Sequence, residues 1–173
     1  ISCFKLLCVY RPLKIGHLTI IANEKTQMKG MFYLLRLEEV NPDNWRLGLH
    51  VKESQKEYVS NAILLLARAY AYREDRSRAV VIYNNDTAIG MALYYDCNDL
   101  NAYILSQFFI DERYQGKGYG LAATVRILDD MRKDRKFKKV ILSCIDGNDT
   151  ARFLYEKCGF RPTGDRDGNE IIM

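Results

Sequence analysis

The stretch FFIDERYQGKGYG, from Phe108 to Gly120, decides the fold of this chain. Its first residues end an apolar run that begins at Leu100, which is typical of a strand buried on both faces. The glycine loop Gln115–Gly120 follows, and apolar residues then recur at helical spacing up to Arg135. This order predicts that the amides of the loop and of the helix start bind an anion such as a pyrophosphate.

Two familiar phosphate-binding motifs do not fit this loop. A P-loop requires GxxxxGK[ST], but Asp111 stands six residues before Lys117, where the first glycine is required, and Gly118 follows that lysine. The dinucleotide fingerprint GxGxxG belongs to a parallel βαβ unit, whereas the spacing here is GxGxG after an antiparallel meander. A glycine-rich turn without a ligand is the alternative.

Strands and helices alternate on both sides of this stretch. Before it we expect a strand at 33–40, a turn and helix start at 41–44, a helix within 53–73 and a hairpin of strands 79–83 and 87–95. After it we expect a helix at 120–135, a strand at 139–144, a helix from 148 to 158 stopped by Gly159, and a turn at 165–169 between short strands. The predicted class is α/β in the α+β sense: one domain with a mixed, mostly antiparallel sheet flanked by helices.

The helix faces are also predicted from spacing. Residues Tyr58, Val59, Ala62, Ile63, Leu66, Ala69 and Tyr70 form the expected buried stripe of the first helix. Residues Leu121, Ala122, Val125, Leu128 and Met131 form that of the helix after the glycine loop.

Composition excludes several classes of function. The formal net charge of +4 in 173 residues is too small to indicate a nucleic-acid partner, and the basic run 132–139 fits a solvated helix end or a phosphate contact. Five cysteines without a CxxC pair and two distant histidines indicate reduced thiols in a cytoplasmic protein and no metal site. No apolar run approaches the ~20 residues of a membrane span.

Residues 1–30 differ from the remainder of the chain. They begin with Ile1, are poor as a signal peptide, and precede the clear patterning that starts after Met31. We expect an N-terminal extension at 1–30, with the part before Met28 an upstream leader or a gene-calling artefact, and a domain at 31–173.

Two segments together resemble a known family. The stretch 108–120 resembles the acetyl-CoA signature [RQ]xxGx[GA] of the GNAT superfamily of N-acetyltransferases, and 148–160, NDTARFLYEKCGF, resembles its NxxAxxLYxxxGF segment. The stretch 108–120 is most similar to the bacterial spermine/spermidine acetyltransferases, and the ending 163–170 also resembles that branch. The resemblance covers about residues 32–173 in the order of elements.

The resemblance implies a role for each matching residue. Backbone groups of Phe108 and Ile110, with Phe109 between them, would pair with the acetyl carbonyl and the pantetheine arm of acetyl-CoA. Amides of the loop would hold its pyrophosphate; the loop residues are Gln115, Gly116, Lys117, Gly118, Tyr119 and Gly120. Asn148 would contact the cofactor arm, or only cap a helix. Tyr155 would protonate the leaving thiolate, or only pack in the core.

One departure concerns the general base. Polyamine acetyltransferases often carry an acidic residue two positions before the Phe-Phe pair, where this chain has Ser106, followed by Gln107. A water relay or an acid elsewhere would then serve; the candidates are Asp96, Asp99, Glu38 and Glu39.

The expected function is transfer of an acetyl group from acetyl-CoA to a small primary amine, with a polyamine as the candidate acceptor. The alternatives are acetylation of a protein or peptide and a non-catalytic acyl-CoA-binding module. The resemblance also implies a homodimer.

Overall fold

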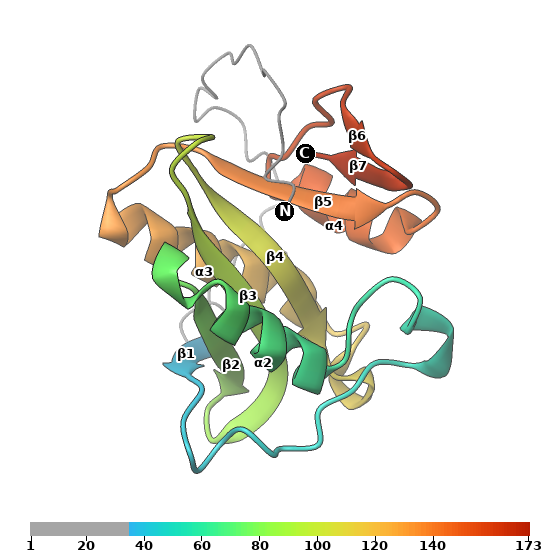
Figure 1. Ribbon diagram of the computed structural model, residues 1–173. Coiled ribbons are helices and arrows are strands. Elements are labelled where there is room, and N and C mark those ends of the chain that lie inside the picture. Colours follow the sequence, from blue (N-terminus) through green and yellow to red (C-terminus); the bar gives the residue numbers. More distant parts are fainter. Residues whose placement is uncertain (1–34) are drawn as a thin grey trace, which may run out of the picture.

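The computed structural model describes residues 35–173. One seven-stranded sheet in the order β1-β2-β3-β4-β5-β7-β6 forms the centre, and helices flank it (Figure 1). The strands are β1 Leu35–Glu39, β2 Arg78–Asn84, β3 Thr87–Cys97, β4 Ala102–Ile110, β5 Val140–Ile145, β6 Arg166–Asp167 and β7 Glu170–Ile172. The helices are α2 Ala62–Ala71, α3 Tyr119–Asp134 and α4 Asp149–Lys157, with single 3-10 turns η1 Glu53–Gln55, η2 Arg73–Asp75 and η3 Glu112–Tyr114.

The sheet divides where β4 meets β5. Strands β1 to β4 form an antiparallel meander, and β5 runs parallel to β4 over Tyr103–Leu105. From Ser143 onward β5 pairs with β7 instead, so the remaining residues of β4 and β5 do not pair with each other. The predicted mixed, mostly antiparallel sheet in a single domain is therefore confirmed, with a gap between its two central strands.

Hydrophobic side chains fill both faces of the sheet. Ile82 and Leu105 pack with Ile127 of α3 and Tyr155 of α4 on one face. Val81, Met91 and Leu93 pack with Leu65 of α2 on the other face. Because side chains alternate along a strand, neighbouring residues such as Val81 and Ile82 serve different cores.

Gly90 lies at the tightest contact between β3 and β4. It pairs with Ile110, and a Cβ atom built on it would come within 2.4 Å of the Phe109 carbonyl oxygen. Only glycine allows the two backbones to approach this closely.

The first predicted helix is shorter than its apolar pattern. The helix begins at Ala62, because the Asn61 side chain accepts a hydrogen bond from Leu64 N at 2.9 Å and caps it, and residues 53–60 form η1 and a loop. Packing on β2 and β3 selects Leu65 for burial, so Ile63 and Tyr70 of the predicted stripe are exposed. The predicted helix start at 41–44 is wrong: Asn41 and Asn44 close a turn with their own side chains.

The face of α3 is also rotated from its prediction. Ala122 and Met131 are buried as expected, but Leu121, Val125 and Leu128 are only half-buried. Ala123, Thr124 and Ile127 are buried in their place, because small residues on this side let α3 lie close to the sheet and to α4.

Some predictions fall outside the described residues. They concern the extension 1–30 and the first two residues of the strand predicted at 33–40. Within residues 35–173, no helix is both long and apolar enough to cross a membrane.

Candidate active site

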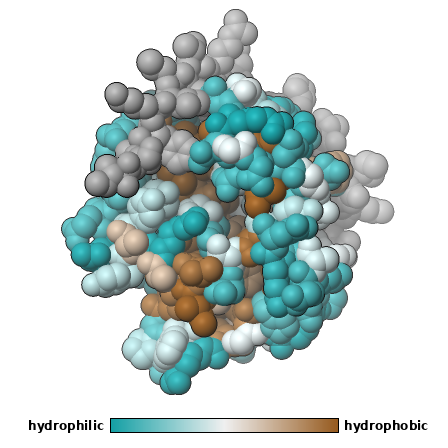
Figure 2. Space-filling model, turned by 45° about the vertical axis from the view of Figure 1, so that its right-hand side comes forward, coloured by the Kyte–Doolittle hydropathy of each residue, from teal (hydrophilic) through white to brown (hydrophobic). Residues whose placement is uncertain are grey.

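A cleft of about 2130 Å³ crosses the molecule at the gap in the sheet. It is lined by β4 and β5, by α2 and α4, by the loop around η1, and by the glycine loop. Figure 2 turns this side forward and shows apolar surface between hydrophilic rims. The cleft brings together nearly all the residues that the sequence proposed for the site.

Backbone groups of β4 face the gap. Asp111 N donates to Ile89 O of β3 at 2.9 Å, and strand backbone groups alternate in direction. Phe109 therefore turns its carbonyl toward β3, in agreement with its contact to Gly90, and Phe108 and Ile110 turn their groups toward β5. Phe108 N–H and C=O lie in the unpaired part of this edge.

The glycine loop presents amides at the start of α3. Gly116 and Gly118 have φ values of 74° and 84°, which side chains rarely allow. The first bond of the helix runs from Ala122 N to Gly118 O at 3.2 Å, so the amides of residues 119–121 have no acceptor within the helix. The helix dipole makes this end positive, and the arrangement suits an anion.

Side chains brace this loop rather than extend from it. Gln115 Nε2 donates to Ile110 O at 2.8 Å and to Gln55 Oε1 of η1 at 2.9 Å. Tyr119 accepts from Asn84 Nδ2 at 2.9 Å, and Lys117 Nζ donates to Arg113 O. Of the loop residues that the sequence proposed for the cofactor, Lys117 and Tyr119 do not line the cleft.

Asp111 fixes the end of β4 to the neighbouring loop. Its fully buried carboxylate accepts from Arg113 Nε at 2.6 Å, from Arg113 Nη2 at 3.0 Å and from His50 N at 3.0 Å. Burial alone would raise the pKa of Asp111, but these hydrogen bonds outweigh it and lower the pKa. Nothing in the sequence pattern indicated this role for Asp111, although the residue stands inside the motif.

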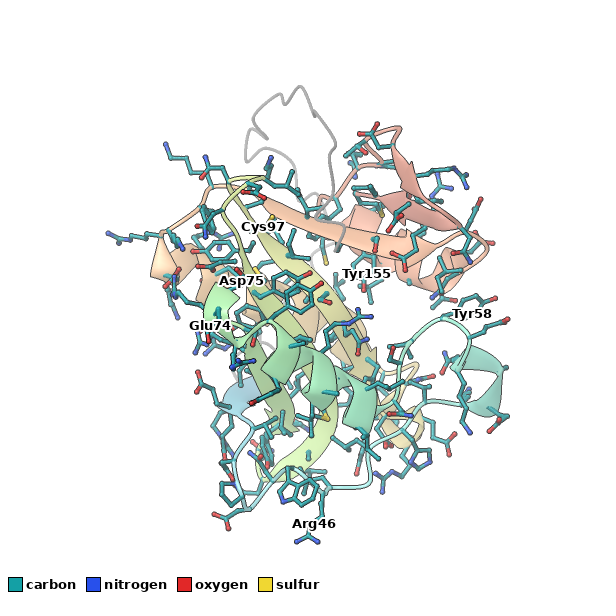
Figure 3. All side chains as sticks on the ribbon, viewed as in Figure 1. Arg46, Tyr58, Glu74, Asp75, Cys97 and Tyr155 are labelled. Carbon is teal, nitrogen blue, oxygen red and sulfur yellow. The ribbon has the colours of Figure 1, made fainter. Side chains whose placement is uncertain are left out.

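Tyr155 lies in the cleft near the place where β4 and β5 separate (Figure 3). It extends from α4 into the core, where its ring meets Phe160 edge-on with 6.0 Å between centroids. Burial raises the pKa of Tyr155, and the nearby thiols of Cys144 and Cys158 add to the effect. The phenol is thus held in its protonated form, as a proton donor requires.

Asn148 caps α4. Its Oδ1 accepts from Ala151 N at 3.1 Å, and the residue also lines the cleft. The cap that the sequence offered as an alternative is therefore present, and the side chain keeps one amide NH₂ beyond it.

The other half of the cleft is made of side chains. Arg68 of α2 reaches across to β4, where its Nη1 donates to Ser106 Oγ at 3.2 Å. Tyr95 of β3 lies beside both, and stacks on Tyr72 with ring centroids 4.4 Å apart. Burial raises the pKa of Tyr95 to about 12. Spacing alone did not indicate this cluster, because its members are far apart in sequence.

Acidic residues outnumber basic ones along the cleft. Nine acidic side chains line it, against five from lysine and arginine. The nine are Glu57, Asp75, Asp96, Asp99, Glu112, Asp149, Asp165, Asp167 and Glu170. Figure 3 shows Asp75 and Cys97 near each other at the end of the cleft away from Tyr58.

Two of the four candidates for the general base lie away from the cleft. Glu38 is held by Arg36 and by Asn41 and Asn44, and Glu39 is paired with Arg78. They point away because their strand, β1, is at the opposite edge of the sheet.

Asp96 and Asp99 do line the cleft. Asp96 is buried in ion pairs with Lys136 at 2.6 Å and Arg76 at 3.1 Å. The basic run 132–139 thus serves mainly the surface of the helix end, and only Lys139 of that run lines the cleft. Within the described residues, no group of histidine, cysteine and acidic side chains could hold a metal ion.

Comparisons with known proteins agree with the motifs. A model of the acetyltransferase (GNAT) family matches residues 36–160. The chain is 32% identical over 148 residues to the spermine/spermidine N(1)-acetyltransferase of Bacillus subtilis (strain 168), a match that covers 80% of this chain and 96% of that protein.

Solved structures share the fold. A spermidine N-acetyltransferase from Vibrio cholerae, in complex with CoA and spermine, has a TM-score of 0.64 at 20% identity, covering 82% of this chain and 95% of that one. An aminoglycoside acetyltransferase in complex with coenzyme A has a TM-score of 0.65 at 14% identity, covering 80% and 94%.

Proposed function

The chain belongs to the acetyltransferase (GNAT) family, and from this premise we propose that it transfers the acetyl group of acetyl-CoA to a primary amine of spermidine or spermine. The transfer would take place by direct attack of the amine while both substrates are bound. Acetyl-CoA supplies an activated thioester. The residues of the cleft bind and orient the two substrates and protonate the leaving thiolate.

The cofactor half of the cleft, made of the gap edge of β4 and the glycine loop, fits the coenzyme. Amides at the start of α3 would hold the pyrophosphate, since glycines at 116 and 118 let the phosphates approach the backbone. The coenzyme arm would lie along the gap between β4 and β5, with Asn148 at its other side. Phe108 N–H would donate to the thioester oxygen and stabilise the negative charge that develops there.

Tyr155 would complete the reaction. Attack by the amine gives a tetrahedral intermediate, and its collapse expels the coenzyme thiolate. A protonated phenol at this place can give the thiolate its proton. This role is supported by the position of Tyr155 in the cleft, where its phenol is protonated at neutral pH.

The excess of acidic side chains in the cleft is the observation that favours a polyamine. A polycation is attracted and selected by such a surface. The open shape of the cleft, where exposed Leu64 and Phe153 line the rim, favours the second candidate, a peptide acceptor.

A screen of acceptors tests the proposal. Coenzyme release would be measured with spermidine, spermine, a simple monoamine and a lysine-containing peptide. We expect the highest kcat/KM with a polyamine. If the monoamine equals spermidine the polyamine is the wrong acceptor, and if no amine releases coenzyme the protein is a binding module.

A homodimer and a cytoplasmic location belong to the same proposal. The free state of Cys97, Cys144 and Cys158 fits a reducing compartment. Sedimentation analysis would determine the oligomeric state, and fractionation of the source cells would determine the location.

A further inference from the structure

Gln107 stands out among the polar residues of the cleft. Its side chain is only 8% exposed, and its Oε1 is a buried polar atom without a hydrogen-bond partner within residues 35–173. Buried polar atoms are nearly always satisfied, and leaving one unpaired costs stability. Gln107 lines the cleft, so the missing donor is expected to come from a bound molecule.

A bulge in β4 aims Gln107 at this place. Leu105 is opposite Tyr94 and Gln107 is opposite Leu93, so Ser106 is the extra residue. Leu105 packs on the α3 side, whereas Phe109, two residues after Gln107, packs on the α2 side. The bulge therefore shifts the alternation, and it turns Gln107 toward α2 and the acceptor half of the cleft, the half lined by Arg68, Ser106 and Tyr95.

One positive charge, that of the exposed Arg68, contacts the residue that precedes Gln107. Arg68 Nη1 is 3.2 Å from Ser106 Oγ, where related enzymes were expected to have an acid. The other titratable groups that line this part of the cleft are Tyr72, Asp75, Tyr95, Asp96, Cys97 and Asp99. Asp96 is already engaged by Arg76 and Lys136.

We propose that Arg68, Ser106 and Gln107 form a pocket that binds the attacking amine in its uncharged form. Gln107 Oε1 accepts a hydrogen from the nitrogen, and the Arg68 guanidinium disfavours the ammonium form of that nitrogen. For the first proton this pocket takes the place of a general base, because the ammonium loses that proton on binding and not during the attack. The inference rests on the proposed acetyl transfer.

The balance of the reaction is simple. The ammonium gives one proton to the solvent as it enters the pocket, and the nitrogen lone pair then attacks the thioester carbon. The C–S bond breaks and Tyr155 gives its phenol proton to the leaving thiolate. The nitrogen then carries two protons and a positive charge, and it returns one proton to the Tyr155 phenolate, which leaves the amide and the thiol. No further reactant is needed.

Calorimetry provides a test that does not depend on turnover. Spermidine would be titrated into the protein with CoA at about pH 8, where a primary amine in water is mostly protonated. Repeating the titration in two buffers of different ionisation enthalpy gives the number of protons released. We expect about one proton per bound spermidine, and clearly less in Arg68→Met. Binding without proton release, or no binding, overturns the proposal.

Steady-state rates give the second test. The ascending limb of the plot of kcat against pH reports the pKa of the amine in its bound state. The ascending limb of kcat/KM reports the pKa of the free amine. In Arg68→Met we expect the kcat limb to move up by about one pH unit, with the kcat/KM limb unmoved. Gln107→Leu should lower kcat/KM by about three- to tenfold, the effect of one neutral hydrogen bond.

The Gln107→Glu variant distinguishes a pocket that binds the uncharged amine from a site that only lacks a general base. A carboxylate should hold the ammonium, so we expect a lower KM and a lower kcat near pH 7. A faster Gln107→Glu variant would overturn the proposal. Arg73→Met is the matched control, since Arg73 is exposed in η2, just after α2, and does not line the cleft.

The two proposals fail in different ways. If the wild-type protein releases coenzyme and the Arg68 and Gln107 variants behave like Arg73→Met, only the pocket is wrong. If no amine releases coenzyme, the proposed function is wrong, and the proton count still decides how the amine binds.

Discussion

The cofactor half and the acceptor half of the cleft are built by different means. The first presents backbone groups of one continuous stretch, from Phe108 to the first turn of α3. The second presents side chains of α2, η2, the end of β3 and the bulge of β4. A backbone site depends on the path of the chain, so it survives most substitutions. A side-chain site changes with each one, which lets a common scaffold accept different amines.

The largest effect should come from Tyr155, which lies where the two halves meet. Tyr155→Phe removes only the hydroxyl, so we expect normal folding, normal acetyl-CoA affinity and a kcat lower by about 10²–10⁴-fold. Because burial raises the pKa of Tyr155, its ionisation should not limit the rate near neutral pH. Tyr83→Phe, outside the cleft, is the control in stopped-time assays of coenzyme release. Full activity of Tyr155→Phe would assign this residue to packing.

A side chain at position 118 should impair acetyl-CoA binding in the cofactor half. Gly118→Val obstructs the approach of phosphates, so acetyl-CoA affinity measured by calorimetry should fall at least about tenfold. The φ of 84° adds strain of roughly 1–2 kcal/mol in the folded state.

Gly168→Ala separates these two causes. Gly168 has a φ of 58° in the turn between β6 and β7, with no atom within 4 Å of an added Cβ. It should lose stability on heating without losing affinity. If a folded Gly118→Val protein bound acetyl-CoA as tightly as the wild type, the proposal that this loop holds the pyrophosphate would be wrong.

The acceptor half can be probed at one end by two neighbouring acids. Asp75 lines the cleft and Glu74 does not, and Figure 3 labels both. Asp75→Asn should raise KM for spermidine roughly two- to fivefold, because it weakens one solvent-screened ion pair, while kcat is unchanged. Added salt should reduce the difference. Glu74→Gln should leave KM unaltered, and equal effects of both changes would mean that only net charge matters.

The smallest effect concerns the stability of the fold at high pH and two tyrosines, Tyr95 of the acceptor half and Tyr155 where the halves meet. The pKa values of Tyr95 and Tyr155 are raised in the folded state, so folding favours their protonated forms. Their contribution is complete below the unfolded pKa near 10 and is lost as pH rises through the folded value. Between pH 10 and 11, each tyrosine should lower the free energy of unfolding by up to roughly 1 kcal/mol. Chemical unfolding should show that the free energy of unfolding falls less steeply with pH in Tyr95→Phe than in the wild type. An identical slope in the two proteins would contradict the prediction.

This difference explains what could be predicted from the sequence. The strand, loop and helix from Phe108 onward were predicted because short-range spacing determines them, and the Asn148 cap and Gly159 stop are equally local. The length of α2 could not be predicted, since the apolar pattern continues through residues that the Asn61 cap excludes from the helix.

Contacts between distant segments carried no signal in one sequence. Arg68 meets Ser106 only because α2 packs across β2 and β3, and the bulge that turns Gln107 is not visible in the run SQFF. Glu38 and Glu39 of β1 were expected as candidates for the general base, but they lie away from the cleft. The local sequence does not indicate at which edge of the sheet a strand will lie. Tertiary pairing therefore decides the acceptor half.

Gly90 has a consequence for how this protein can vary. Even the methyl group of alanine at this position would collide with the Phe109 carbonyl and force β4 away from β3. Within the plane of the sheet, that movement narrows the gap toward β5, where the acetyl arm is proposed to lie. We therefore expect the width of this gap to depend on a residue that does not line the cleft, and a mutational scan should find position 90 as intolerant of substitution as position 155.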